Sequence, residues 1–331
     1  MKFLVYGVNG WIGGKVYNFL KNNKFDVEVG NSRVENVYEL EKEILEKKPT
    51  HIISLIGRTH GTYEGQYIGT IDYLEKPGKV YENVRDNLFG PMVLSLLSKK
   101  YNFHFTYLGT GCIFQFDEEH PFGQEVEGFN EESLPNFYGS SYSIVKGMTD
   151  QLMHLVEESV LNVRIRMPIT DEFNKRNFIT KITTYEKVCS VPNSMTVLNE
   201  LIPLMIDMAV NNRTGTVNLT NPGLISHNEI LEMYKEIVDP DFTWKNFTIE
   251  EQNAILASGR SNNYLDTNKL ESYYPELMNI KDSVRKMLIQ MKENKEHIDE
   301  NEENEDNKEK NKENDENKEN EENEENEECI K

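Results

Sequence analysis

Residues 3–14 read FLVYGVNGWIGG, and this stretch decides the fold class. An apolar run at 3–6 leads into a Gly-x-x-Gly-x-x-Gly run at 7–13, and apolar residues then recur at helical spacing as far as residue 22. The pattern predicts a strand, a glycine-rich turn and a helix. Such a turn lets the backbone approach a phosphate group, which the helix N-terminus binds through its N–H donors and dipole. The alternative is an ordinary glycine turn.

The same alternation continues along the first half of the chain. It predicts strands at 25–29, 51–56, 103–108 and 162–166, and helices at 37–47, 84–99 and 141–157. Strands that alternate with helices of this length imply parallel βαβ units. We therefore expect an α/β protein with a Rossmann-type doubly wound parallel sheet, whose ligand lies beyond the carboxyl ends of the strands.

The pattern loosens after Pro168, where a short segment at 216–219 mixes with helices expected at 227–237 and 280–292. We expect residues 1–167 to form a dinucleotide-binding domain, with returning segments later in the chain. Residues 168–292 are expected to form mainly a smaller substrate-binding cap that closes over a cleft.

The end of the chain has a different composition. Residues 291–331 contain nineteen acidic residues and seven lysines, a net charge of −12 out of −21 for the whole chain. Because such a segment has almost no apolar surface to bury, we expect residues 293–331 to be a disordered acidic tail. A solvating role is one interpretation of the tail, and binding of a basic partner is the other.

The remaining composition argues against several classes of protein. A net charge of about −9 provides no basic face for nucleic acid. No apolar run reaches the roughly 18–20 residues that span a bilayer, and the N-terminus lacks a signal-peptide layout. Three cysteines, Cys112, Cys189 and Cys329, are too few and too scattered for a disulfide framework or a zinc site. We therefore expect no metal and a reducing, cytoplasmic compartment.

Residues expected to bind a cofactor follow the first three strands. They are Gly7, Asn9, Gly10, Trp11, Ile12 and Gly13, then Asn31, Ser32 and Arg33, then Ile56, Gly57 and Arg58, with Asn87 ordering the site through backbone contacts. NAD-binding proteins often place an acid after the second strand to hold the ribose 2′-hydroxyl. This chain has none there, and Arg33 can pair with a 2′-phosphate, which favours NADP (NADPH over NADH). Alternatively, Arg33 and the later residues belong to solvated loops.

A reducing centre is predicted where Tyr142 and Lys146 form Tyr-x-x-x-Lys on an expected helix, so that both side chains share one face. The ammonium favours the phenolate, so Tyr142 can pass a proton to a ketone oxygen as hydride reaches its carbon. Both residues are also expected to contact the cofactor. Thr110, just past the fourth strand, can donate to the same carbonyl. Alternatively, the spacing of Tyr142 and Lys146 arises by chance on a helix, and Thr110 is a turn residue whose side chain bonds to its own backbone.

Several longer stretches resemble one family: GWIGG at 10–14, GTGCIF at 109–114, RMPI at 166–169, RNFITKI at 176–182, YEKV at 185–188, VPNSMT at 191–196, NPG at 221–223, SHNEILEMY at 226–234, FTWKNF at 242–247 and RSNN at 260–263. They are similar to the bifunctional UDP-4-keto-6-deoxy-D-glucose 3,5-epimerase/4-reductases of UDP-L-rhamnose synthesis, in the extended short-chain dehydrogenase/reductase superfamily. The resemblance covers roughly residues 2–290. The more distant dTDP-4-dehydrorhamnose reductases carry Ser-Thr-Asp-Tyr-Val-Phe at 109–114, so this chain keeps Thr110 and replaces the tyrosine with Cys112.

A cysteine at this position suits an epimerase, because a C4 ketone acidifies the hydrogens on C3 and C5. A thiol becomes a plausible base once a cation favours its thiolate. The resemblance implies that Cys112 acts in epimerisation with Lys181 as its partner. From the residues alone, Cys112 is a buried apolar thiol and Lys181 a solvated lysine.

Substrate-binding residues are expected among Thr110, Asn177, Asn193, Arg260 and Asn263. Arg260 can bind a diphosphate, and Asn193 resembles a contact on the uridine side. The alternative for each is a residue of an ordinary surface loop.

The sequence thus predicts an NADPH-dependent epimerase and reductase acting on a UDP-sugar. Two alternatives stay open: a monofunctional 4-ketoreductase, and a non-catalytic nucleotide-binding regulatory subunit. The expected partners are a separate upstream 4,6-dehydratase and a second copy of the chain, since a homodimer through the long helices is usual for this fold.

Overall fold

A six-stranded parallel sheet forms the centre of the molecule in the computed structural model, which describes residues 1–122 and 127–296. Its order is β11-β7-β6-β3-β1-β2. The strands are β1 (Lys2–Tyr6), β2 (Asp26–Val29), β3 (His51–Ser54), β6 (His104–Thr110), β7 (Val160–Ile165) and β11 (Gly215–Asn218). The expected α/β class with a doubly wound parallel sheet is therefore confirmed.

Strand order reverses between β1 and β3, because β2 pairs with one edge of β1 and β3 with the other. The chain leaves β1 and β3 in opposite directions at this switch point, which opens a crevice beyond their carboxyl ends. The glycine-rich loop after β1 and the Ile56–Arg58 loop after β3 both lie at this edge of the sheet.

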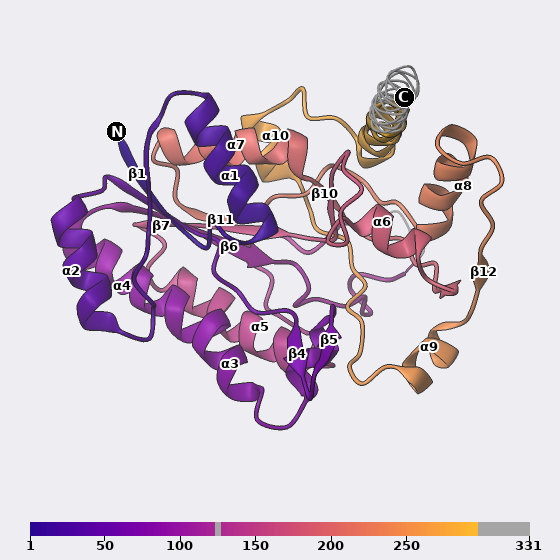
Figure 1. The fold of residues 1–331 in the computed structure, drawn as a ribbon, viewed down its shortest axis with the longest axis horizontal. Helices are drawn as coiled ribbons and strands as arrows, with labels where there is room; N and C mark the ends of the chain where they lie inside the picture. The colour runs from indigo at the N-terminus through magenta and orange to yellow at the C-terminus, as the bar shows by residue number, and fades with distance from the viewer. Residues whose placement is uncertain (123–126, 297–331) are drawn as a thin grey trace, which may run out of the picture.

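Helices cover both faces of the sheet (Figure 1). On one face lie α1 (Trp11–Asn22), α7 (Leu198–Val210) and α10 (Asn268–Tyr273), and on the other α2 (Val37–Lys47), α4 (Gly90–Tyr101) and α5 (Ser141–His154). Along β1, Phe3 and Val5 join the first apolar core, whereas Leu4 and Tyr6 join the second. This alternation explains why the strand is apolar throughout.

The connection from β3 to α4 is more elaborate than the sequence suggested. It contains a hairpin, β4 (Gly61–Tyr63) and β5 (Gln66–Ile68), then η1 (Ile71–Glu75), α3 (Val80–Val84) and the π-helical segment η2 (Arg85–Phe89). The helix expected over 84–99 thus begins earlier, at Val80, and runs through η2 into α4. π-helical turns of this kind are frequent at functional sites, and η2 carries Asn87.

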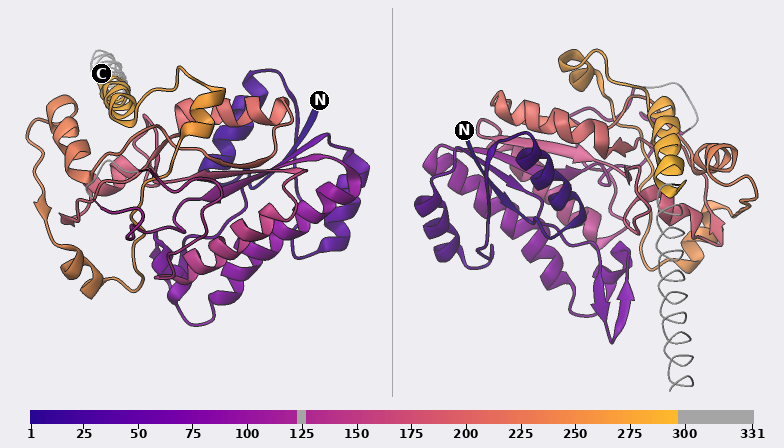
Figure 2. Two further views of the ribbon diagram at one scale, coloured as in Figure 1. Left: turned by 180° about the vertical axis from the view of Figure 1, so that it is seen from behind. Right: turned by 45° about the horizontal axis from the view of Figure 1, so that its top comes forward.

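The later part of the chain builds a separate apolar core beside the sheet (Figure 2). This core is built by β8 (Pro168–Ile169), α6 (Phe178–Thr183), β9 (Lys187–Val188), β10 (Thr196–Val197), α8 (His227–Ile237) and a helix over 280–296. The same part of the chain includes β12 (Lys245–Asn246), which is exposed, and α9 (Ile249–Ile255), which has no buried residue. The segments α7 and β11 return to the main sheet.

The final helix extends further than expected. The sequence placed its end at residue 292, but residues 293–296 are helical as well. Glu and Lys are good helix formers, and the buried Met291 anchors the preceding turn. The rest of the expected tail, residues 297–331, lies outside the described residues. Within residues 1–122 and 127–296, no helix combines the length and apolar character needed to cross a bilayer.

Candidate active site

The loop after β1 requires glycine at two positions. Gly7 has φ +85°, and a Cβ there would lie 2.8 Å from the backbone carbon of Leu55. A Cβ on Gly13 would lie 2.0 Å from the carbonyl oxygen of Gly7. The N-cap residue of α1, Gly10, provides no side-chain cap, and the first turn has no acidic residue. The first-turn N–H groups and the positive end of the helix dipole therefore suit an anionic phosphate.

The loop after β2 is held by a carboxylate that sequence reasoning missed. Glu43 of α2 accepts the backbone N–H groups of Asn31 and Ser32, both at 2.9 Å. Burial opposes its ionisation, but these donors lower the pKa of Glu43 to about 2. The backbone N–H groups of Asn31 and Ser32 are thus already bonded to Glu43. Arg33 is 65% exposed and pairs with Glu35 at 3.0 Å.

The loop after β3 is fastened to η2 by Asn87. The Asn87 side chain accepts the N–H of Arg58 at 2.9 Å and donates to the Arg58 carbonyl at 2.8 Å. Arg58 also donates from Nε to Asp86 at 3.0 Å. Asn87 is fully buried and therefore orders the Ile56–Arg58 loop through its backbone.

Thr110, Cys112 and Tyr142 come together where β6 ends and α5 begins. Ser140 caps α5 by accepting the N–H of Ser143 at 3.0 Å, which fixes the helix start beside Tyr142. The Thr110 hydroxyl donates to the carbonyl of Ile165 at 3.4 Å and accepts the N–H of Cys112 at 3.1 Å, and it is close enough to the Tyr142 phenol to affect the pKa of Tyr142. Burial raises the pKa of Tyr142 above its usual value, so the phenol keeps its proton at neutral pH.

Lys146 lies one turn further along α5 and is buried. Its Nζ donates to the hydroxyl of Tyr107 and, at 3.1 Å, to the carbonyl of Leu108. Burial lowers the pKa of Lys146 to about 7, although the charges of Asp150 and Cys112 oppose this change. Tyr107 was not anticipated from the sequence, because a tyrosine in an apolar strand gives no sign of the lysine it will meet.

Lys181 of α6 lies among other cations. Burial, followed by the charges of Arg176 and Arg260, lowers the pKa of Lys181. Burial and the same group of cations, including Arg58 and Lys181, lower the pKa of His60 to about 4. Such a cluster has the electrostatic character of a site for an anionic group.

Arg260 is held in place by an acid that the sequence did not single out. Its Nη2 lies 2.6 Å from Asp72 of η1, and its Nη1 donates to Ser258. Arg176 donates to the hydroxyl of Tyr67 at 2.9 Å, which joins the β4–β5 hairpin to the segment before α6.

The three asparagines expected to bind substrate are fully buried. Asn177 caps α6 and bonds to Thr170 and Glu172. Asn193 accepts from Arg166 and from the N–H of Asn263, while its amide donates to Val191 and Asn262. The Asn263 amide donates to Gly111 and Phe114. These bonds hold the three asparagines in place within the protein, and their direct contact with substrate stays a prediction.

Two proteins share most of their length with this chain. Protein L780 of Acanthamoeba polyphaga mimivirus is 52% identical over 292 residues, 88% of this chain and 99% of L780. The crystal structure of L780, a UDP-rhamnose synthase, matches with a TM-score of 0.84. A bifunctional dTDP-4-dehydrorhamnose 3,5-epimerase/dTDP-4-dehydrorhamnose reductase of Arabidopsis thaliana is 43% identical over 289 residues, 87% of this chain and 92% of the relative.

The chain belongs to this family of bifunctional epimerase/reductases. Beyond the epimerase/reductases, the fold is shared with a dTDP-4-dehydrorhamnose reductase from Bacillus anthracis, solved in complex with NADP. Its TM-score is 0.70 at 17% identity, covering 88% of this chain and 100% of that one. A scan against models of known protein families returns no match.

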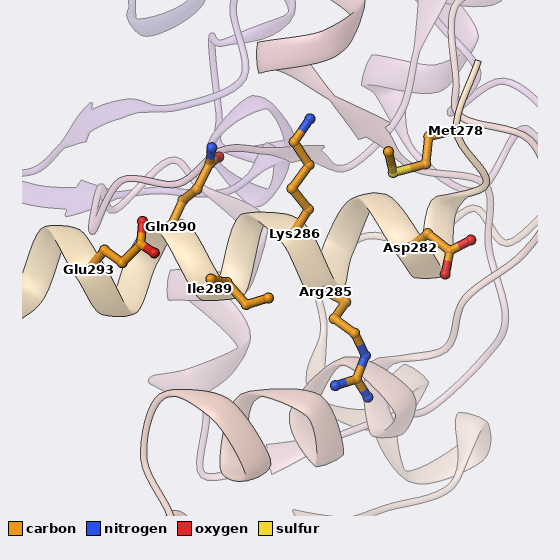
Figure 3. A pocket seen from close by; sticks show the side chains of 7 residues that line it. All are labelled: Met278, Asp282, Arg285, Lys286, Ile289, Gln290 and Glu293. Carbon is orange, nitrogen blue, oxygen red and sulfur yellow. The ribbon is translucent and has the colours of Figure 1, made fainter. Parts of the chain in front are cut away.

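A surface cavity of about 480 Å³ lies elsewhere on the epimerase/reductase, along the helix over 280–296 (Figure 3). Its lining residues are Met278, Asp282, Arg285, Lys286, Ile289, Gln290 and Glu293. Its two cations are paired, Arg285 with Glu236 at 3.0 Å and Lys286 with Glu200 at 3.3 Å. The cavity contains none of the residues that meet at the ends of β1, β3 and β6, so we do not assign it to the chemistry.

Proposed function

We propose that this enzyme converts UDP-4-keto-6-deoxy-D-glucose to UDP-β-L-rhamnose by 3,5-epimerisation followed by 4-keto reduction, with NADPH as the reductant. One observation carries the proposal: Thr110, Cys112, Tyr142 and Lys146 converge at the carboxyl edge of the sheet that also holds the glycine loop.

The reduction follows from the protonation states at this edge. Reduced nicotinamide, when bound, supplies a hydride to C4 of the sugar. Tyr142 keeps its phenolic proton at neutral pH and gives it to the C4 oxygen, while the Thr110 hydroxyl donates to the same oxygen. Lys146 lies four residues along the same helix, where its ammonium is bonded to Tyr107, and it is the lysine that would stabilise the phenolate of Tyr142.

The epimerisation needs a base and an acid on opposite faces of the sugar ring. Cys112 lies beside Thr110 and Tyr142 and removes the proton from one of the two carbons, C5 or C3, giving the enolate of the C4 ketone. Lys181 returns a proton on the other face. Before the second carbon reacts, Cys112 releases its proton to solvent and Lys181 regains one from solvent. Burial and its cationic neighbours lower the pKa of Lys181, which makes the ammonium a stronger acid than an exposed lysine.

The loops after β1, β2 and β3 provide the contacts to the cofactor. Gly7, Gly10 and Gly13 and the N–H groups of the first turn of α1 hold the pyrophosphate. Arg33 binds the 2′-phosphate once it leaves Glu35, which makes NADPH preferred over NADH. Replacement Arg33→Ala should therefore weaken NADPH binding and leave NADH binding nearly unchanged.

The substrate diphosphate binds at the cationic cluster of Lys181, Arg176 and Arg260, beside the neutral ring of His60. A separate 4,6-dehydratase supplies the keto-sugar. The enzyme forms a homodimer through the exposed apolar faces of α3, η2 and α5.

The test is incubation of the purified protein with UDP-4-keto-6-deoxyglucose and NADPH, without any other epimerase, followed by NMR of the product. We expect UDP-β-L-rhamnose, and slower turnover of the dTDP-linked substrate. Turnover only of a substrate already epimerised at C3 and C5 would identify a monofunctional reductase. Absence of turnover together with retained nucleotide binding would favour a regulatory subunit.

A further inference from the structure

The short helix η1 is bonded to two segments that border the candidate site. At its end, Glu75 accepts the backbone N–H of Ser141 at 2.7 Å, and Ser141 begins the helix α5 that carries Tyr142. Near its start, Asp72 accepts the backbone N–H of Ser258 at 3.1 Å and the hydroxyl of the same serine at 2.8 Å. Helix η1 therefore ties the start of α5 to a segment that lies 186 residues after Asp72 in the chain.

Arg260 belongs to this later segment and lies close to both reactive loops. The residue before it donates its backbone N–H at 2.8 Å to the carbonyl of Gly139, just ahead of α5. The residue after it donates its hydroxyl at 2.6 Å to the carbonyl of Phe114, in the loop that also contains Cys112. The backbone at Arg260 is thus fixed between the two segments that supply the side chains of the proposed chemistry.

The guanidinium of Arg260 is held along one edge. Its Nη2 donates to Asp72 at 2.6 Å, and its Nη1 donates to the carbonyl and the hydroxyl of Ser258 at 2.9 and 2.6 Å. Thr70 fixes the carboxylate in turn, because its hydroxyl donates to Asp72 at 2.6 Å. A guanidinium has five N–H donors, and these bonds do not use the fork formed by Nε–H and the second Nη2–H. The Arg260 side chain is 27% exposed, so a solute can reach it.

Asp72 places a negative charge where the substrate brings an anion. Burial opposes the ionisation of Asp72, but the hydrogen bonds that it accepts, first of all from Arg260, lower its pKa to about 2. The carboxylate is therefore charged at neutral pH and repels a phosphate. If charge alone mattered, removing it would strengthen the binding of an anion. A useful contribution of Asp72 to an anion site has to be geometric.

We propose that Asp72 is a positioning residue that aims the open Nε–Nη2 fork of Arg260 at the diphosphate of the sugar nucleotide, an inference that rests on the proposed function. The carboxylate takes the outer edge of the guanidinium, so it does not compete with phosphate oxygens for the side edge. Because a free arginine side chain has many rotamers, fixing it in advance reduces the entropy cost of ordering it when the diphosphate binds.

The test is the affinity of the full-length protein for UDP, measured by isothermal titration calorimetry without any keto-sugar or NADPH. Arg260→Gln should weaken UDP binding by about tenfold, because a charge-assisted contact is lost. Asp72→Asn should weaken it by at least about fivefold, although this substitution removes a negative charge. Glu64→Gln is the matched control, because it removes an exposed carboxylate from the neighbouring β4–β5 hairpin, and the affinity should stay at the wild-type value.

The double variant Asp72→Asn/Arg260→Gln distinguishes positioning from a general effect on the fold. If Asp72 acts through Arg260, the double variant should bind UDP as Arg260→Gln alone does, because the two losses are not additive. Losses that multiply would mean that Asp72 does not act through Arg260, and they would overturn the inference.

If Asp72→Asn does not fold, Ser258→Ala decides. It keeps both charges and removes the hydroxyl that is bonded to Asp72 and to Arg260. We expect it to weaken UDP binding by about threefold or more, and an unchanged affinity overturns the inference.

Unchanged or tighter UDP binding by folded Asp72→Asn also overturns the inference, as does a wild-type protein that does not bind UDP. Because the assay contains no reaction, these results leave epimerisation and reduction to be tested by turnover of the sugar nucleotide. Conversely, coupling between Asp72 and Arg260 in a protein without turnover would remove the proposed function but keep the role of Asp72 in binding a nucleoside diphosphate.

Discussion

In the proposed mechanism, Tyr142 acts in the reduction and Cys112 acts in the epimerisation. The two side chains are nevertheless close enough for a charge on Cys112 to affect the pKa of Tyr142. A thiolate at Cys112 adds to burial in raising the pKa of Tyr142. The base of the epimerisation therefore helps keep the acid of the reduction protonated until hydride transfer requires its proton.

Single substitutions should separate the two half-reactions. Tyr142→Phe should lower the rate of 4-keto reduction by roughly 10²- to 10⁴-fold, because the proton donor is lost. Cys112→Ser should leave reduction of a pre-epimerised substrate within a fewfold of wild type and abolish exchange at C3 and C5. NADPH oxidation and NMR of the sugar measure the two steps. Equal loss of both steps in both variants would contradict this division.

Because the pKa of the buried Lys146 is lowered, we expect the free energy of unfolding to depend on pH in a particular way. Its pKa is lowered to about 7 in the folded chain, so the folded state binds fewer protons than the unfolded state between pH 7 and about 10.4. Below pH 7, burial of the ammonium lowers the free energy of unfolding by its full amount. This loss of stability disappears as the pH rises from 7 to about 10.4.

Lys146→Met should therefore gain stability relative to wild type, and the gain should be larger at pH 7 than at pH 9 by on the order of 2 kcal/mol. Thermal unfolding of both proteins at the two pH values measures the difference. Lys42→Met, at an exposed lysine on α2, is the control and should show no such trend. A gain that is independent of pH would mean that Lys146 is not the titrating group.

Among the site residues, sequence reasoning succeeded where the signal is local. Tyr142 and Lys146 were found because a spacing of four places them on one helix face. Asp72 and Glu43 were missed as functional residues because their partners come from distant segments. Arg164, the one charged residue of β7, was the sign that this strand holds buried charge.

The turn between β1 and α1 is the element on which cofactor binding depends most. Gly13→Ala would force a Cβ to within 2.0 Å of a backbone oxygen that cannot move without breaking the turn. We expect this variant to lose NADPH binding, measured by fluorescence titration, and to unfold at a lower temperature.

Gly14→Ala is the matched control in the same helix turn. Its Cβ would meet the Val8 carbonyl oxygen at 3.5 Å, an ordinary contact, so the better helix propensity of alanine should stabilise the protein by up to about 1 kcal/mol. NADPH affinity should stay unchanged. Equal effects of the two substitutions would argue against a sterically required Gly13.

Some elements could not be predicted from periodicity. Helix α7 has the sequence LNELIPLMIDMAV, which is apolar on most sides and contains Pro203. The sequence therefore shows little difference between an apolar and a polar face of the helix. It is buried against the sheet, which removes the need for a polar face. The β4–β5 hairpin has strands of three residues around Glu64 and Gly65, too short for an alternating pattern.

At the scale of the whole molecule, apolar side chains are exposed on neighbouring helices of one face. Val80 and Tyr81 of α3, Phe89 of η2, and Ile144 and Met148 of α5 are each more than one-third exposed, and these helices pack together. Such a surface is typical of an interface between subunits.

Met148→Glu should therefore shift the protein from dimer to monomer, because a carboxylate would be buried at the centre of this surface. Light scattering coupled to size-exclusion chromatography measures the mass. Leu45→Glu on α2, which is 48% exposed on another element, is the control and should remain dimeric. A wild-type protein that is monomeric at micromolar concentration would refute the predicted dimer.

In the proposed reaction, one site performs both proton exchange and hydride transfer. The most direct test is to run the reaction in D₂O with NADPH and UDP-4-keto-6-deoxyglucose and to read the isotopes of the product by NMR. We predict UDP-β-L-rhamnose with deuterium at C3 and C5 and hydrogen at C4. A reduced sugar with hydrogen at C3 and C5, or no reduced sugar at all, would contradict the claim.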